Sequence, residues 1–130
     1  MTKQIIIISN QLESPWLATA IDALQSFGVS HVFSEENIFN QSSVKLCDLI
    51  LIDASSINKD LVEMIKQLCR NYYKKPIVVM TNSPTWRRAK EVILAGAVEY
   101  TRRTFDRKKI VELCENAIKR YPITTPCQDK

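Results

Sequence analysis

The side chains best suited to chemistry in this sequence stand where its apolar runs end. Asp53 closes the run 48–53, and a carboxylate at the end of a buried strand is a suitable beginning for a catalytic or metal site. Ser9 and Asn10 follow the run 3–8, at a place where metal-assisted chemistry would need further acids. The sequence leaves open whether Asp53 belongs to a working site or to the remains of one.

Other kinds of site find little support. The only glycines are Gly28 and Gly96, so there is no glycine-rich phosphate loop, and the hydroxyl-rich loop that flavin binding needs is absent after the first run. His31 has no nucleophile beside it and no metal-ligand spacing to a cysteine. We therefore expect no bound metal, no cofactor and no enzymatic activity. The four cysteines, Cys47, Cys69, Cys114 and Cys127, form no C-x-x-C pair. Three of them lie in or beside apolar stretches, where a reduced cysteine behaves as a small hydrophobe.

Five short apolar segments have the length and composition of strands. The runs 3–9 and 48–53 are continuously apolar, which is typical of strands covered on both faces of a parallel sheet. Pro76 stands at the first position of a later strand, where its missing N–H is tolerated. The predicted strands are 3–9, 29–34, 48–53, 76–81 and 97–103.

Stretches with helical periodicity connect these strands. Ser14 and Pro15 form a helix-start signal, and Gly28 is the predicted stop. A second Ser-Pro pair at 83–84 predicts another start, and Gly96 its end. The other connections predict a short or irregular helix at 35–47 and regular helices at 61–72 and 106–121.

This alternation predicts an α/β fold with a parallel sheet and helices on both faces. Ligands of such sheets bind outside the carboxyl ends of the strands. The residues expected at those ends are Ser9, Asn10, Ser34, Asp53, Thr81 and the segment 101–103.

Length and composition predict one globular domain. The chain has 130 residues, of which 45% are hydrophobic and 25% charged, so it is neither disordered nor fibrous. We expect a domain over 1–121 and a flexible tail over 122–130. No apolar run reaches the length of a membrane span or of a signal peptide, which predicts a cytoplasmic protein without membrane contact.

Charge is distributed unevenly along the chain. Residues 1–65 carry three basic and eight acidic side chains, a net charge of −5. Residues 66–130 carry fifteen basic and six acidic side chains, a net charge of +9. A basic surface can attract an acidic protein or a phosphate backbone, so the second half is the place to look for a partner.

Four stretches together resemble the receiver domain of bacterial response regulators, the CheY-like module that accepts a phosphoryl group from a histidine kinase. They are "IIIISNQ", "DLILIDASS", "PIVVMTNS" and "AGAVEYTRRTF", and the similarity spans residues 3–121 without large insertions. The resemblance implies a flavodoxin-like, three-layer αβα fold with a five-stranded parallel sheet. It further implies a role in two-component signal transduction.

Three functional positions of that family are matched. The resemblance places Asp53 at the phosphoacceptor aspartate, Thr81 at the switch hydroxyl and Tyr100 at the switch aromatic. The pocket residues that it implies around the aspartate are Ser9, Asn10, Ser55, Thr81, Asn82 and Arg103.

Other positions depart from the family pattern. Ser9 and Asn10 replace the two acids that hold Mg²⁺, and Arg103 replaces the phosphoryl-contacting lysine. Asn82 stands where the family prefers a very small residue, and is expected to narrow the access to Asp53. Each lost carboxylate about 4 Å from the ion forfeits several kcal/mol, and about 4 kcal/mol already means a thousandfold loss of affinity. We therefore expect no Mg²⁺ here.

The sequence leaves two possibilities for the contacts of Arg103. Arg103 or Arg102 can pair permanently with Asp53, because a planar guanidinium binds carboxylates well. Alternatively, Arg103 points to solvent.

A basic face is implied where receiver domains contact their partners and sister subunits, namely the fourth helix, fifth strand and fifth helix of that family. Trp86, if exposed, would be its most informative residue, because tryptophan is enriched at binding hot spots. The alternative is that these charges form an ordinary solvated surface. The residues concerned are Trp86, Arg87, Arg88, Lys90, Arg102, Arg107, Lys108 and Lys109.

Three functions follow in order of preference. The first is an atypical receiver, or pseudo-receiver, that signals by protein contact without Mg²⁺-dependent phosphorylation, with protein partners and a homodimer through the basic face. The second is a single-domain response regulator phosphorylated on Asp53 by a histidine kinase, with Mg²⁺ as its cofactor. The third is a nucleic-acid-binding accessory domain, which is less favoured because the sequence shows no DNA-binding motif.

Overall fold

A single five-stranded parallel sheet organises the chain. The computed structural model describes residues 3–40, 46–57, 60–72 and 75–120. The strand order is β2-β1-β3-β4-β5, and every neighbouring pair is parallel. The predicted α/β fold, with its three layers, is confirmed. The strands are β1 (Lys3–Ile8), β2 (Gly28–Phe33), β3 (Leu49–Asp53), β4 (Ile77–Thr81) and β5 (Glu99–Arg102).

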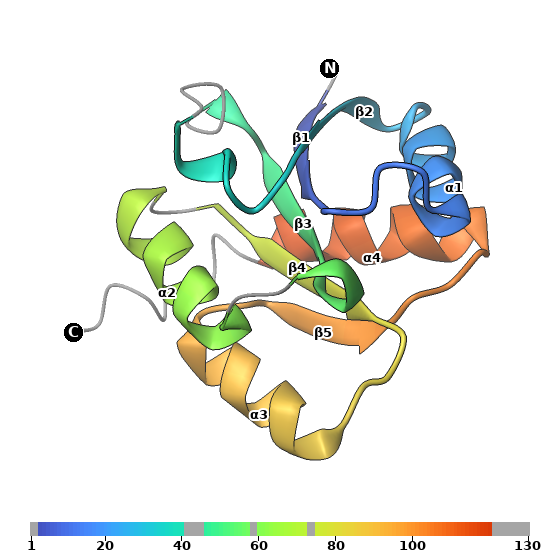
Figure 1. Cartoon of the computed structure of the whole chain (residues 1–130). Helices are drawn as coiled ribbons and strands as arrows, with labels where there is room; N and C mark the ends of the chain where they lie inside the picture. The colour runs from blue at the N-terminus through green and yellow to red at the C-terminus, as the bar shows by residue number, and fades with distance from the viewer. Residues whose placement is uncertain (1–2, 41–45, 58–59, 73–74, 121–130) are drawn as a thin grey trace.

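Helices cover both faces of this sheet (Figure 1). One face packs against α1 (Pro15–Leu24) and α4 (Arg107–Arg120), and the other against α2 (Leu61–Asn71) and α3 (Trp86–Ala95). Short 3₁₀ helices, η1 (Ile38–Asn40) and η3 (Ala54–Ser56), follow β2 and β3. Within the described ranges, no helix combines the length and apolar character needed to cross a membrane.

The central strands are fully buried because helices cover them from both sides. Residues 5–8 of β1 and 49–52 of β3 are each 0% exposed, as expected for the middle strands of a parallel sheet. Alternate side chains of these strands enter different hydrophobic clusters, one on each face. The predicted doubly buried strands are therefore confirmed.

Helix ends agree with the sequence in part. Ser14 caps α1 as predicted, since its Oγ accepts a hydrogen bond from the Leu17 N–H at 3.3 Å. Gly96 ends α3 with a φ of 131°, a conformation that favours glycine. The predicted start of α3 at the Ser-Pro pair 83–84 is wrong, because the chain bends there and Thr85 provides the cap. In the 35–47 connection, the short irregular helix is the 3₁₀ turn η1, while residues 41–45 lie outside the described residues.

The role predicted for Gly28 was wrong. The helix α1 already ends at Leu24, and Gly28 instead opens β2 opposite Lys3. A Cβ at this position would lie 2.2 Å from the Lys3 carbonyl oxygen, so the two backbones approach each other more closely than any side chain allows.

Gly28→Ala is therefore expected to lower the free energy of unfolding by about 1 to 3 kcal/mol, the usual cost of overpacking. The clash involves backbone atoms of β1, which cannot rotate away as a side chain would. Urea unfolding followed by circular dichroism measures the loss. Gly28→Ala with wild-type stability would show that β1 and β2 separate there at no cost.

The buried cysteines behave as apolar side chains. Cys114 is 0% exposed, and burial raises the pKa of its thiol to about 12. Burial also raises the pKa of the Cys47 thiol. Cys47, Cys69 and Cys114 are all free thiols. Cys127, the 121/122 domain boundary and the tail predicted at 122–130 lie outside the described residues.

Candidate functional site

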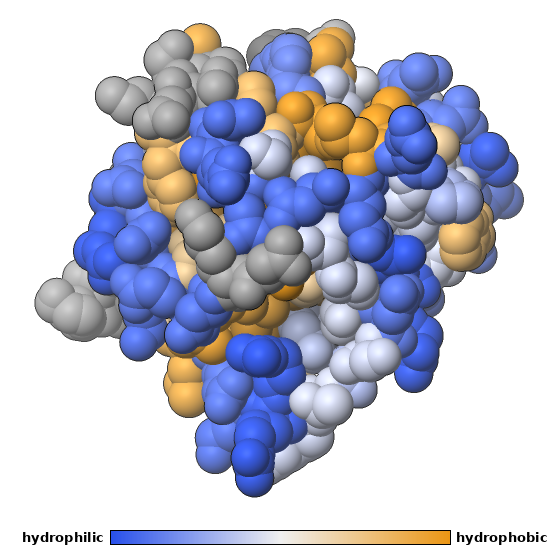
Figure 2. All heavy atoms as spheres, viewed as in Figure 1, coloured by the Kyte–Doolittle hydropathy of each residue, from blue (hydrophilic) through white to orange (hydrophobic). Residues whose placement is uncertain are grey.

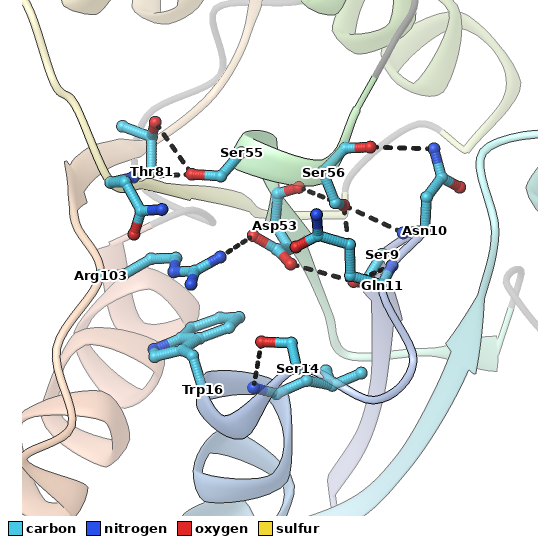
Figure 3. A network of polar contacts seen from close by, with 12 residues as sticks. Ser9, Asn10, Gln11, Ser14, Trp16, Asp53, Ser55, Ser56, Thr81 and Arg103 are labelled. Atoms are coloured by element: carbon cyan, nitrogen blue, oxygen red, sulfur yellow. Dashed lines mark hydrogen bonds and ion pairs between the residues drawn. The ribbon is translucent and has the colours of Figure 1, made fainter.

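Asp53 lies at the carboxyl edge of the sheet with both of its side-chain oxygens occupied (Figure 3). Its Oδ1 pairs with Nη1 of Arg103 at 2.9 Å, and its Oδ2 accepts a hydrogen bond from Ser9 Oγ at 2.9 Å. The Asp53 side chain is 0% exposed, and that of Arg103 only 13%. The negative charge of Asp53 is thus compensated inside the protein by a cation of the same chain.

Strand order explains how these three residues meet. Ser9 follows β1 and Asp53 ends β3, and the two strands are neighbours with Ile8 opposite Ile52. Arg103 follows β5, where its N–H bonds the Thr81 carbonyl at 2.9 Å and extends the pairing of β4 with β5. From there the long arginine side chain reaches across β4 to β3. The contact with Asp53 is a single hydrogen bond through Nη1.

The Arg103 guanidinium packs against the ring of Trp16. The Arg103 guanidinium carbon lies 5.0 Å from the centroid of the Trp16 ring, within the range of a cation–π contact. Trp16 is 0% exposed, and its Nε1 donates to the Thr104 carbonyl at 2.9 Å. Through this hydrogen bond, Trp16 connects the segment after β5 to the start of α1. Figure 3 shows the Trp16 ring beside the Arg103 side chain.

A second network occupies Asn10. Its side-chain amide donates to Glu35 and, at 3.1 Å, to the Ser56 carbonyl, while its Oδ1 accepts from the Glu35 N–H at 3.0 Å. Ser56 Oγ accepts from the Asn10 N–H and donates to the Asp53 carbonyl, both at 2.9 Å. The Asn10 side chain is thus directed to Glu35 and the η3 turn, and it contributes no side-chain hydrogen bond to Asp53.

Thr81, Ser55 and Asn82 form a separate group beside Asp53. The Thr81 and Ser55 hydroxyls lie 3.4 Å apart, and Ser55 Oγ accepts from the Asn82 N–H at 2.7 Å. Arg102 donates to the Asn82 carbonyl at 2.8 Å. Arg103 and not Arg102 is therefore the partner of Asp53, and the solvent-pointing alternative for Arg103 does not occur.

Comparison with known proteins identifies the architecture. No protein-family model matches the sequence, and no curated protein matches it. Among solved structures, a CheY-like response regulator receiver domain from Methanospirillum hungatei JF-1 matches with a TM-score of 0.78 at 12% identity, covering 95% of this chain and 98% of that one. The chain has the receiver-domain fold.

Further structures agree with this assignment. A signal receiver domain of an HD domain-containing protein from Pseudomonas fluorescens Pf-5 has a TM-score of 0.78 at 13% identity, covering 95% of this chain and all of the other. A response regulator receiver protein from Pseudoalteromonas atlantica has a TM-score of 0.75 at 20% identity, covering 89% and 97%. At such identities the likeness concerns the fold, which confirms the flavodoxin-like topology.

The Mg²⁺ site implied by the receiver resemblance can be tested against these residues. Mg²⁺ prefers carboxylate and water oxygens in octahedral geometry. Here Asp53 is already paired with Arg103, the Ser9 hydroxyl donates its hydrogen bond to Asp53, and the Asn10 side chain is bonded to Glu35 and Ser56. Among the described residues, no group of three or more His, Cys, Asp or Glu side chains comes together to hold a metal ion. The residues of this receiver fold do not fit Mg²⁺.

Tyr100, which the sequence predicts as the switch aromatic, stands apart from Asp53. It is half-buried and lines a cleft of about 830 Å³ between the starts of α2 and α3. Thr81 and Arg88 line the same cleft. The structure therefore places Tyr100 and Thr81 in the cleft next to α3. Arg103 and Ser9, which contact Asp53, do not line this cleft.

Two arginines of the predicted basic face form ion pairs with acids of this chain. Arg88 pairs with Glu91 at 3.5 Å, and Arg107 with Asp22 at 2.7 Å. Trp86 is 80% exposed, with the Lys90 ammonium 5.7 Å from its ring centroid. Figure 2 shows strongly hydrophilic side chains gathered over α3 at the lower end of the view. The exposed members are Trp86, Arg87, Arg88, Lys90, Arg102, Arg107, Lys108 and Lys109.

Sequence reasoning missed three contributors to this site. Trp16, Glu35 and Ser56 were not among the predicted pocket residues. A usable signal existed for Trp16, which stands directly after the Ser14–Pro15 helix start and therefore at the carboxyl edge. Ser56 follows Asp53 by three residues, the spacing at which a serine hydroxyl reaches back to a carbonyl. Nothing in the sequence pattern indicated Glu35.

Proposed function

We propose that this chain is an atypical receiver domain that transmits signals by protein contact, without Mg²⁺-dependent phosphorylation of Asp53. One observation carries the proposal: the Asp53 carboxylate is buried, paired with the Arg103 cation and hydrogen-bonded by Ser9. The receiver fold supports a signalling role by analogy. Such a module would act in the cytoplasm and need no catalytic residue of its own.

The chemistry of acyl-phosphate formation explains why the pairing matters. A carboxylate must present a free oxygen in line with the phosphoryl donor, and cations must neutralise the charge on the transferring group. Both Asp53 oxygens are engaged, and the nearby cation is used to balance Asp53 itself. The pairing therefore leaves Asp53 without a free oxygen for a phosphoryl donor.

Incubation with a small phosphodonor and Mg²⁺, followed by intact-mass measurement, tests the proposal. We expect the wild-type mass to stay unchanged. The variant Ser9→Asp, Asn10→Asp, Arg103→Lys restores the acids and the lysine of the family pattern, and we expect it to gain a phosphoryl mass in the presence of Mg²⁺ only.

Asp53→Asn in each background is the control. A phosphoryl mass on the wild-type chain that disappears in Asp53→Asn would contradict the proposal. It would favour the alternative of a single-domain response regulator, with a histidine kinase as upstream partner and Mg²⁺ as cofactor.

The signal is proposed to pass through contact with a protein partner. Trp86 is exposed on α3, and exposed tryptophan is typical of binding hot spots. The homodimer through α3, β5 and α4 stays a prediction, and so does the low preference for nucleic acid. Binding to duplex DNA that weakens with salt and with Arg87→Ala plus Arg88→Ala would favour the nucleic-acid function instead.

A further inference from the structure

An exposed apolar stripe runs along α3. Trp86 is 80%, Leu94 78% and Ile93 43% exposed. At about 100° per residue, Trp86, Lys90 and Leu94 follow one another on one side of the helix, with Ile93 beside them. We call these four residues the α3 stripe. Exposed apolar side chains gathered on one helix side mark an interaction surface rather than the scattered exposure of ordinary surfaces.

The α3 stripe faces away from α2. The opposite side of α3 carries the buried Val92 and lines the cleft next to α2 through Arg88 and Glu91. Since Glu91 is the only acid of α3 and pairs with Arg88, no carboxylate of this helix balances Arg87 or Lys90. The α3 stripe therefore presents apolar side chains together with uncompensated positive charge.

The same chain carries a surface of matching chemistry. A cleft of about 290 Å³ lies between η1 and α2. Among its described lining residues, four carry carboxylates and none is basic. We call it the acidic cleft. Its exposed carboxylates are Glu36, Asp60 and Glu63, while Glu35 is buried and bonded to Asn10. Of its apolar members, Phe39 is half-buried and Met64 is buried.

The two surfaces lie at opposite ends of one layer. Residues of η1, α2 and α3 pack in the same hydrophobic cluster on one face of the sheet, and α2 contacts α3. The acidic cleft lies on the η1 side of α2, whereas the α3 stripe points away from α2. Figure 1 shows α2 and α3 following each other along this side of the sheet. One molecule therefore cannot place its own stripe in its own cleft.

We propose that a second copy of this chain occupies the α3 stripe, with the stripe of one copy seated in the acidic cleft of the next. The contact joins two different surfaces, so it is heterologous, and repetition produces a ring or an open chain. This inference goes beyond the proposed function and does not involve Asp53.

Charge favours this arrangement over a symmetric one. A two-fold contact between α3 stripes would bring Arg87 and Lys90 of both copies together, and like charges at an interface cost several kcal/mol. The head-to-tail contact places the same cations against Glu36 and against Glu63, which would exchange its exposed pairing with Arg70 for one of them. Trp86 and Leu94 would at the same time leave water against the half-buried Phe39, which lines the cleft.

Complementary variants test the direction of the contact. Trp86→Ala with Lys90→Glu disables the stripe, and Glu36→Lys with Glu63→Lys disables the cleft; both pairs avoid the Asp53 network and the helix cap Asp60. The matched control is Glu112→Lys with Glu115→Lys, the same change of charge at exposed positions of α4. Analytical ultracentrifugation at about 0.05 M and about 0.5 M salt measures self-association.

We expect wild type and control to associate in a concentration-dependent manner that weakens with salt. Each disabled variant should associate at least about tenfold more weakly, as expected when a hot spot is removed. A mixture of the two disabled variants retains one intact stripe and one intact cleft, so it should form a discrete dimer.

Three outcomes would overturn the inference. The first is a wild-type chain that stays monomeric up to about 1 mM at low salt. The second is a cleft-disabled variant that dimerises like wild type, which indicates a symmetric contact. The third is a mixture that contains only monomers. Unchanged circular dichroism of each variant verifies folding.

Discussion

Arg103→Met is expected to lower the free energy of unfolding by about 3 to 5 kcal/mol, the usual cost of leaving a buried charge without its partner. Methionine keeps much of the apolar volume of the arginine side chain, so the loss reports the charge and not a cavity. Asp53, 0% exposed, would retain, among the described residues, only the Ser9 hydroxyl as a side-chain hydrogen-bond donor. Urea unfolding monitored by circular dichroism measures the effect.

A double-mutant cycle separates the pair from the rest of the site. Asp53→Asn removes the charge with little change of shape, so the double variant Asp53→Asn, Arg103→Met has no unpaired buried charge. We expect it to be more stable than the sum of the single effects predicts, with a coupling free energy of about 2 kcal/mol or more.

The exposed pair of Arg107 and Asp22 is the matched control. Its atoms lie 2.7 Å apart, but the side chains are 61% and 56% exposed, so water screens the interaction. The coupling in its own cycle should lie between about 0 and 1 kcal/mol. If the Asp53–Arg103 coupling were no larger than this control, the buried ion pair would not exist in solution.

Trp16→Ala is expected to cost about 3 to 5 kcal/mol, because it removes a fully buried aromatic side chain and leaves a cavity. Part of this loss should come from the contact with Arg103, whose guanidinium then lacks the ring beneath it. Trp16→Phe retains an aromatic face but loses the hydrogen bond to the Thr104 carbonyl, and should cost about 1 to 2 kcal/mol.

The positioning role of Trp16 is distinguished from plain packing by its coupling to Arg103. Trp16→Ala combined with Arg103→Met should show a coupling of about 0.5 to 2 kcal/mol, the range of a cation–π contact. Leu24→Ala removes another fully buried side chain of the same helix and cluster, and should be additive with Arg103→Met. Equal coupling for Trp16 and Leu24 would mean that Trp16 acts by packing alone.

The fold could be predicted from the sequence because its signals are local. Continuous apolar runs of strand length, separated by helical periodicity, are sufficient to indicate a parallel sheet covered on both faces. Boundaries were less secure. Gly28 resembled a helix stop, and only the close approach of the Lys3 carbonyl reveals why glycine stands there. Similarly, Ser83 was the predicted cap of α3, but Thr85 caps this helix because the chain bends after β4.

The sequence by itself determined which residues come to the carboxyl edge of the sheet, because a strand of known direction delivers its last side chain there. It could not determine which of them touch. Asp53 and Arg103 are 50 positions apart, and Trp16 and Thr104 are 88 apart. Such contacts depend on strand order and on side-chain rotamers, which only the packed tertiary structure selects. From the sequence, Arg103 could pair with Asp53 or point to solvent, and the tertiary structure pairs it with Asp53.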